Sequence, residues 1–204
     1  MRRTTVNQPP ESPIARWLWV DLETTGLGYD RADPSRIVDD AILEVAAVVT
    51  TGDLEVVGAF GPVTVRGDEG ALERMVPYVR QMHTRTGLLE RVRGPQARGI
   101  GDVDADLSEW MAGHGLDVGV VLAGSSVKLD FDFIRRHMPA TFARLHYRVI
   151  DVSSFKEALR VWRPSLIEEM EDGWTSKHQA MDDILDSIAE LRRYRGLFAS
   201  GVVA

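Results

Sequence analysis

The segment from Arg16 to Gly26 constrains the fold more than any other part of the sequence. Four apolar residues, Trp17 to Val20, are followed at once by Asp21 and Glu23, and then by the turn-forming residues Thr24-Thr25-Gly26. A short apolar run bounded by turn residues is typical of a buried strand. The sequence therefore predicts a core strand with acidic side chains at its carboxyl end.

Asp21 and Glu23 are two residues apart, so their side chains share one face of an extended chain. Two carboxylates at the end of a core strand repel each other unless a cation joins them. The alternative is an exposed pair at a strand end, but the apolar run before the pair and Gly26 after it favour a shared ion. This pair is the first candidate metal site.

The rest of the chain predicts an α/β fold, with a mixed central sheet flanked by helices. Further strands are expected at 41–50, 55–60, 62–65, 117–123 and 147–151, with turns at Gly52-Asp53 and Gly61-Pro62. Helices are expected at 69–75, 84–91, 102–111, 127–137, 153–162 and 179–195, the last three ending at Pro139, Pro164 and Gly196. The acidic segment 165–177 is expected to form a surface loop, and Trp17, Trp19, Trp110 and Trp162 are expected in the core. A meander followed by alternating strands and helices gives this fold class.

The composition indicates one globular domain, because 204 residues with 44% hydrophobic content can bury a core of ordinary size. Residues 1–14 are polar and are predicted to be a disordered tail, leaving 15–204 as the domain. Cysteine is absent, so His, Asp and Glu remain as metal ligands. No apolar run approaches the roughly 18 residues that span a bilayer, which favours a soluble, cytoplasmic protein.

The formal net charge of −7 argues against a broad contact with duplex nucleic acid, because such binding depends on Lys and Arg residues that release counterions. A short or single-stranded nucleic acid remains compatible with this charge. Part of the acidity is explained if carboxylates are neutralised by bound ions.

A third carboxylate is predicted to face the interior. In a helix, Asp130 lies on the same stripe as Phe133 and Ile134, whereas Asp132 lies one turn from Arg135. Asp130 therefore points inward and Asp132 pairs outside. A buried carboxylate needs a partner, and a metal ion is a reasonable one.

The last helix opens with a histidine and two further acids. His178 is followed four residues later by Asp182 and five residues later by Asp183. A histidine near a helix start is often a cap or surface residue, but beside acidic groups it can take a proton from a reacting water. Helix geometry alone leaves open which aspartate binds metal.

These residues together resemble a known enzyme family. Asp21-x-Glu23, Asp130, and His178 with four residues before Asp183 match the DEDDh exonucleases, which have a ribonuclease-H-like fold. Within them the chain resembles the oligoribonucleases from about Trp17 to Tyr194. The similar segments are 82–88, 124–126, 146–156 and 178–183.

The resemblance implies a catalytic centre and an activity. Asp21, Glu23, Asp130 and Asp183 would hold two Mg²⁺ or Mn²⁺ ions, with His178 as general base, and the spacing favours Asp183 over Asp182. The implied activity is a 3′→5′ exoribonuclease that hydrolyses short RNA, with dinucleotides favoured, to nucleoside 5′-monophosphates.

The resemblance also implies the residues that bind the substrate. The positions that match a cap on the 5′ phosphate are Ser126, Arg148 and Ser153, and Tyr147 would reach in from the partner subunit of a homodimer. The positions that match contacts near the bases are Leu27 and Tyr78, and His83 in the similar segment 82–88 is a further expected substrate-binding residue. Stacking by Tyr78 is chemically sensible because every base offers a π-face.

The sequence departs from the oligoribonuclease pattern at several places. Thr24 stands where methionine is usual, and Ser125 replaces a usual asparagine. The segment 28–40 is longer than the family norm, and the segment 165–177 is an unusual acidic loop just before His178. These departures leave open a related exonuclease that acts on single-stranded DNA or on longer RNA 3′ ends. A catalytically silent binding protein would be expected to lack some of the five catalytic residues, and none is missing.

Overall fold

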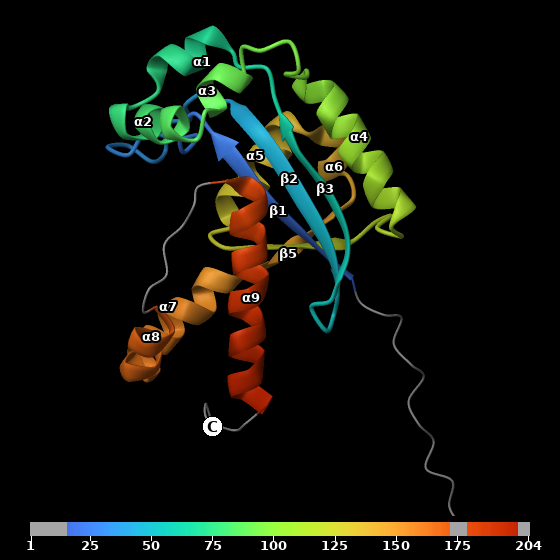
Figure 1. Cartoon of the computed structure of the whole chain (residues 1–204), viewed down its shortest axis with the longest axis vertical. Helices are drawn as coiled ribbons and strands as arrows, with labels where there is room; N and C mark the ends of the chain where they lie inside the picture. Colours follow the sequence, from blue (N-terminus) through green and yellow to red (C-terminus); the bar gives the residue numbers. More distant parts are fainter. Residues whose placement is uncertain (1–15, 172–178, 200–204) are drawn as a thin grey trace, which may run out of the picture.

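The computed structural model describes residues 16–171 and 179–199, arranged around one five-stranded sheet (Figure 1). The predicted tail at 1–14 and His178 lie outside the described residues. The strands are β1 (Arg16–Thr24), β2 (Ile42–Thr51), β3 (Val56–Thr64), β4 (Val120–Gly124) and β5 (Leu145–Asp151), in the order β3-β2-β1-β4-β5. β1, β2 and β3 are antiparallel, whereas β4 is parallel to both β1 and β5. The predicted mixed sheet is confirmed.

The predicted turn at Gly61-Pro62 is wrong, because β3 continues through both residues. Val45 pairs with Val63 and Ala47 pairs with Phe60, so Gly61 and Pro62 together lie opposite Ala46, and the one extra residue of β3 is accommodated as an irregularity in the pairing. Gly61 has φ +78°, which glycine adopts without steric cost. β3 is an edge strand, where a proline without an N–H is tolerated.

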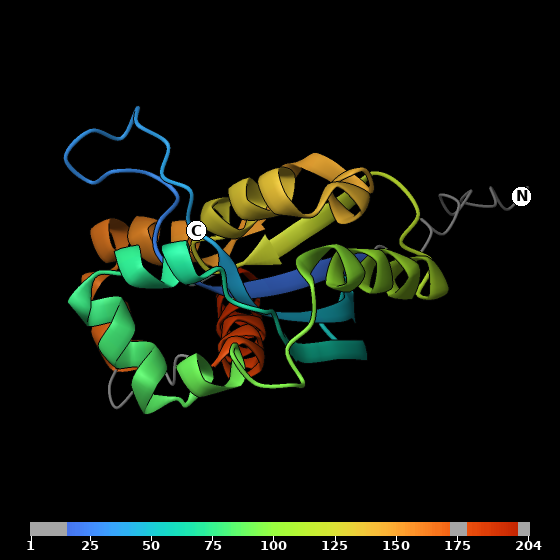
Figure 2. The same ribbon diagram turned by 90° about the horizontal axis from the view of Figure 1, so that it is seen from above.

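The helices lie on both faces of the sheet and beyond its end (Figures 1 and 2). They are α1 (Glu69–Arg74), α2 (Pro77–Arg85), α3 (Leu88–Arg91), α4 (Ile100–Gly113), α5 (Lys128–His137), α6 (Pro139–Phe142), α7 (Val152–Trp162), α8 (Pro164–Glu171) and α9 (Ala180–Ala199). Apolar side chains of α4 and α5 pack on one face, and those of α7 and α9 on the other. Among the described residues, no helix is both long and apolar enough to cross a bilayer.

Two predicted helix ends are confirmed and others are corrected. α5 ends at His137 and α7 at Trp162, as expected, and Pro139 and Pro164 then begin α6 and α8, because proline lacks only an N–H that the first turn leaves unpaired. α8 therefore occupies 164–171, where a loop was expected, and 172–177 lie outside the described residues. Gly87, at φ +71°, divides the predicted helix 84–91 into α2 and α3, whereas α9 continues through Gly196.

The tryptophans divide between core and surface. Trp19 is fully buried and donates from Nε1 to Thr50 Oγ1 at 2.9 Å, while Trp17 and Trp110 are partly buried at the edges of the two cores. Trp162 is 67% exposed, so its predicted core position is wrong. It is the last residue of α7, beyond the packing of that helix.

A buried cap on α6 gives a stability prediction. The carboxylate of Asp104, which is 3% exposed, accepts from the backbone N–H groups of Ala140 and Thr141, both at 2.8 Å. Asp104→Ala leaves both donors unpaired and should lower the free energy of unfolding by about 1–3 kcal/mol. Urea denaturation measures this loss, and Glu109→Ala on the exposed side of α4 is the control. Equal stability of the two variants would contradict the assigned cap.

Candidate active site

Three carboxylates meet where β1 ends beside the first turn of α9. Carboxylate oxygens of Asp21, Glu23 and Asp183 all lie within 4.8 Å of one another. Odd-numbered residues of β1 face the same side as Trp19, which packs with α9, so the strand directs both acids toward that helix. The structure therefore brings together three of the residues predicted to hold metal.

Asp130 reaches the same strand end from α5. Its side chain is 5% exposed, and its Oδ1 accepts from the backbone N–H of Leu22 at 3.0 Å. No local partner was expected for this carboxylate, and the structure supplies one from β1. Asp132 faces outward and pairs with Lys128 and Arg135, as expected.

The electrostatics of the site favour protonation of its acids when no cation is present. Burial, and then repulsion from Asp183 and Glu44, raises the pKa of Asp21 to about 7. Burial, and then repulsion from Asp21, Asp183 and Glu44, raises the pKa of Glu23 to about 8, while Arg91 acts in the opposite direction. Burial and the Asp21 charge raise the pKa of Asp130 well above its usual value. A bound cation would offset this repulsion and favour the ionised forms.

Glu44 is a fifth acid at the site that the sequence interpretation missed. It lies on β2 directly opposite Glu23, is 4% exposed, and accepts from Arg91 Nη2 at 3.0 Å. The sequence signal that could have found Glu44 was a glutamate inside the apolar run 41–50, because a buried charge needs a partner. That partner comes from α3, 47 residues away.

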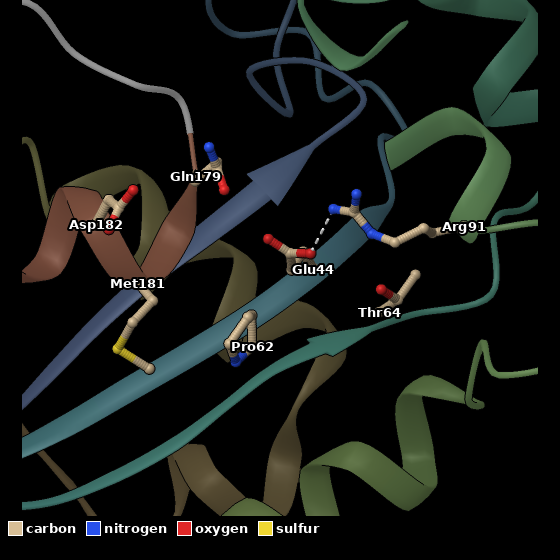
Figure 3. Close-up of a pocket in the computed structure, with 7 residues that line it drawn as sticks. All are labelled: Glu44, Pro62, Thr64, Arg91, Gln179, Met181 and Asp182. Atoms are coloured by element: carbon tan, nitrogen blue, oxygen red, sulfur yellow. Dashed lines mark hydrogen bonds and ion pairs between the residues drawn. The ribbon is translucent and has the colours of Figure 1, made fainter. Parts of the chain in front are cut away.

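Asp182 and Asp183 face different surroundings. A pocket of about 360 Å³ next to the carboxylates has Asp182 on one wall, across from Glu44 and Arg91 (Figure 3). The other lining residues are Pro62, Thr64, Gln179 and Met181. Asp183 instead joins Asp21 and Glu23. The geometry thereby separates two aspartates that helix periodicity had left equivalent.

His83 lies beside Glu23 and the end of β1. It is fully buried, with Nε2 2.8 Å from the carbonyl oxygen of Thr24 and Nδ1 3.8 Å from Glu23 Oε2. Its contacts are thus with the end of β1, and in this position it supports Glu23 and the turn that follows. A direct contact with substrate stays a prediction.

Ser126 and Ser153 are brought together by an aspartate that the sequence interpretation had not assigned to the site. Asp151 Oδ1 accepts from the N–H of Ser126 at 3.0 Å, from the N–H of Ser153 at 3.0 Å and from Ser153 Oγ at 2.6 Å. Asp151 is the N-cap of α7, a role for which an aspartate before a helix is a usual signal. The two serines lie beyond the carboxyl ends of β4 and β5.

The remaining predicted substrate residues lie at the surface. Tyr147 is 73% exposed on the edge strand β5, with Arg148 Cζ 5.3 Å from the centre of its ring. Tyr78 is 68% exposed on α2, and Leu27 is half-buried in the turn after β1. His178 lies outside the described residues, immediately before Gln179.

Comparison with known proteins defines the class. The family model described as exonuclease (RNase T) matches residues 18–191, and the chain belongs to this family. It is 39% identical over 181 residues to the oligoribonuclease of Streptomyces coelicolor, covering 88% of this chain and 85% of the relative. It is 37% identical over 182 residues to that of Thiobacillus denitrificans, covering 89% and 93%. Within the exonucleases it belongs with the oligoribonucleases, which confirms the resemblance inferred from the motifs.

Solved structures support the fold. Exonuclease I superposes with a TM-score of 0.62 at 17% identity, over 87% of this chain and 40% of that one. The exonuclease I of Methylocaldum szegediense gives a TM-score of 0.66 at 18% identity, over 89% and 40%. The chain thus spans about two fifths of the length of these proteins, and the likeness concerns the fold of that part.

The raised pKa values of Asp21 and Glu23 predict an unusual pH dependence for the metal-free protein. The folded protein keeps protons that the unfolded chain releases, so the free energy of unfolding should fall as pH rises from about 5 to about 8. Urea denaturation with a chelator measures this slope. Asp21→Asn should flatten it, whereas Asp39→Asn, which changes an exposed acid, should not. Stability that rises across this window would contradict the assignment.

Proposed function

We propose that this exonuclease removes nucleotides from the 3′ end of short RNA, with dinucleotides favoured, and releases nucleoside 5′-monophosphates. The observation that carries the proposal is the cluster of Asp21, Glu23 and Asp183, with Asp130 reaching the same strand end. Oligoribonucleases that share 37–39% identity along most of the chain support the choice of RNA.

The acidic cluster fits a site for divalent cations. Carboxylate oxygens are the ligands that Mg²⁺ and Mn²⁺ prefer, and crowded acids with raised pKa values gain from a cation between them. We assign Asp21, Glu23, Asp130 and Asp183 as the residues that would hold two such ions. When bound, two divalent ions orient and activate the attacking water and stabilise the charge that develops on the leaving oxygen.

The side chains around the acids divide the remaining tasks. His178, by its place in the motif, takes the proton of the attacking water. Ser126, Ser153 and Arg148 offer hydrogen-bond donors to the 5′ phosphate of a short substrate, and a phosphate held there limits its length. Leu27 and the exposed ring of Tyr78 contact the bases.

The outer edge of the sheet supports a homodimer. β5 is an edge strand with Tyr147 and Val149 exposed, and α7, which follows it, exposes Val161 and Trp162. Exposed large apolar side chains on an edge strand and on the helix that follows it are typical of contact surfaces. A second copy on this edge would carry its Tyr147 toward the 5′-phosphate site.

Cleavage of single-stranded DNA or longer RNA 3′ ends is the second candidate. It is favoured by Thr24 in the first motif and by the segment 28–40, which stands away from the body of the molecule (Figure 2). Such a loop adds surface beside Leu27 that a dinucleotide would not fill.

Substrate choice is tested with 5′-labelled RNA and DNA of two to ten nucleotides, each with Mg²⁺, Mn²⁺ or chelator. Dinucleotide RNA should be cleaved rapidly and decamers slowly, because the 5′-phosphate contacts limit length. The opposite order would favour the second candidate. Asp21→Ala should reduce the rate at least about a hundredfold, since it removes a ligand that the transition state depends on. Cleavage that survives both Asp21→Ala and chelator would overturn the metal mechanism.

The dimer is tested by analytical ultracentrifugation. The chain should sediment as a dimer, and Trp162→Ser together with Tyr147→Ala should shift it toward monomer by removing apolar contact area. Tyr78→Ala, an exposed aromatic on α2 away from this edge, is the matched control. A monomeric unmodified chain would contradict the proposal.

A further inference from the structure

The turn between Glu23 and Leu27 is held by a buried carboxylate that takes no part in the chemistry described above. Asp40 immediately precedes Ala41 and β2, and it is 7% exposed. A buried carboxylate is costly unless it is fully hydrogen-bonded, so its contacts indicate what it does.

Both oxygens of Asp40 bind the turn, one on each side of Leu27. Oδ1 accepts from Thr25 Oγ1 at 3.0 Å, and Oδ2 accepts from the backbone N–H of Gly28 at 2.8 Å. Thr25 is itself fixed to Ala41 by two hydrogen bonds of 2.9 Å, one from its N–H and one to its Oγ1. Leu27 is thereby bracketed by two anchored residues.

Close packing restricts the backbone conformation of the turn at Gly26 and Gly28. A Cβ added to Gly26 would lie 2.5 Å from Asp40 Oδ2, so the carboxylate occupies the space that a side chain would need. Gly28 has φ +74°, and its carbonyl oxygen accepts from Arg136 Nη1 at 3.2 Å and from the Val38 N–H at 3.1 Å. Arg136 of α5 thus holds the Gly28 end of the turn, while Asp40 binds both Thr25 and Gly28.

We propose that Asp40 is a positioning residue that sets where Leu27 stands relative to Glu23, and thereby how tightly the terminal base is held. Charge-assisted hydrogen bonds to a backbone N–H and a hydroxyl are strong and directional, so they fix the turn before substrate arrives. Asp40 acts through Leu27 and does not touch the substrate. This inference rests on the proposed function, because Leu27 is assigned there to the bases.

The role is tested by a double-mutant cycle between Asp40 and Leu27. Asp40→Asn keeps one acceptor oxygen but puts an NH₂ group where the other accepted, so the turn loses one anchor. It should raise KM about tenfold with a much smaller change in kcat, as should Leu27→Ala. The double variant should have nearly the KM of Leu27→Ala alone, because the two residues act on one contact. Asp39→Asn, an exposed neighbour, should leave KM unchanged.

Other outcomes separate this role from a purely structural one. KM effects that multiply in the double variant, or an Asp40→Asn variant with unchanged KM, would overturn the proposal. If Asp40→Asn does not fold by circular dichroism, Thr25→Val removes one of the same hydrogen bonds and should raise KM in the same direction. The kinetics use whichever oligonucleotide the unmodified chain cleaves best, so a wrong substrate preference does not affect the cycle. A chain that cleaves none would overturn the proposed function and this inference with it.

Discussion

The crowding of carboxylates at the carboxyl end of β1 is the constraint on which the rest of the site depends. Asp21 and Glu23 face one side of the strand, and α9 adds Asp183 within 4.8 Å. Burial and mutual repulsion raise the pKa values of Asp21 and Glu23 to about 7 and about 8. Such a cluster persists only where the backbone around it cannot relax. β2 pairs with β1 as far as Thr24, whereas the pairing with β4 stops at Trp19, so the end of β1 is held by β2 and by the hydrogen bond from Leu22 N–H to Asp130.

The alternation of side chains along β1 explains how acids from two helices reach one point. Trp19 packs toward α9, as Asp21 and Glu23 do, whereas Leu18 packs with the core of α4 and α5. Asp183 therefore approaches from one face of the sheet and Asp130 from the other. Asp130 binds the N–H of Leu22, which lies between the two acids of β1. Past the end of a strand, the backbone of that strand no longer separates the two faces of the sheet. Side chains from both faces can therefore meet there and form such a cluster.

Buried and partly buried polar side chains around the acids bind backbone groups. Asp40 binds the turn after β1, Asp151 binds the two serines beyond β4 and β5, and His83 binds the Thr24 carbonyl. Each fixes a loop or turn before substrate arrives, which lowers the entropy that substrate binding must remove. The Glu44–Arg91 pair does the same for the strand beside Glu23. The preorganisation of the site thus depends on several residues that are not assigned to the metal ions or to proton transfer.

The sequence by itself determined the fold class, the strand that ends in Asp21 and Glu23, the inward direction of Asp130 and the family. These depend on local periodicity and on motif spacing, which a single chain displays directly. It misjudged Gly61-Pro62, Gly87, Gly196 and Trp162, because whether a glycine or proline interrupts an element, and whether a side chain is covered, depends on its neighbours in space. The motif spacing already favoured Asp183 over Asp182, and the tertiary structure places Asp183 beside Asp21 and Glu23. Only the tertiary structure decided that Glu44, Asp40 and Asp151 support these acids. These contacts join residues that are between 12 and 162 positions apart in the sequence, and only the folded sheet brings them within reach of each other.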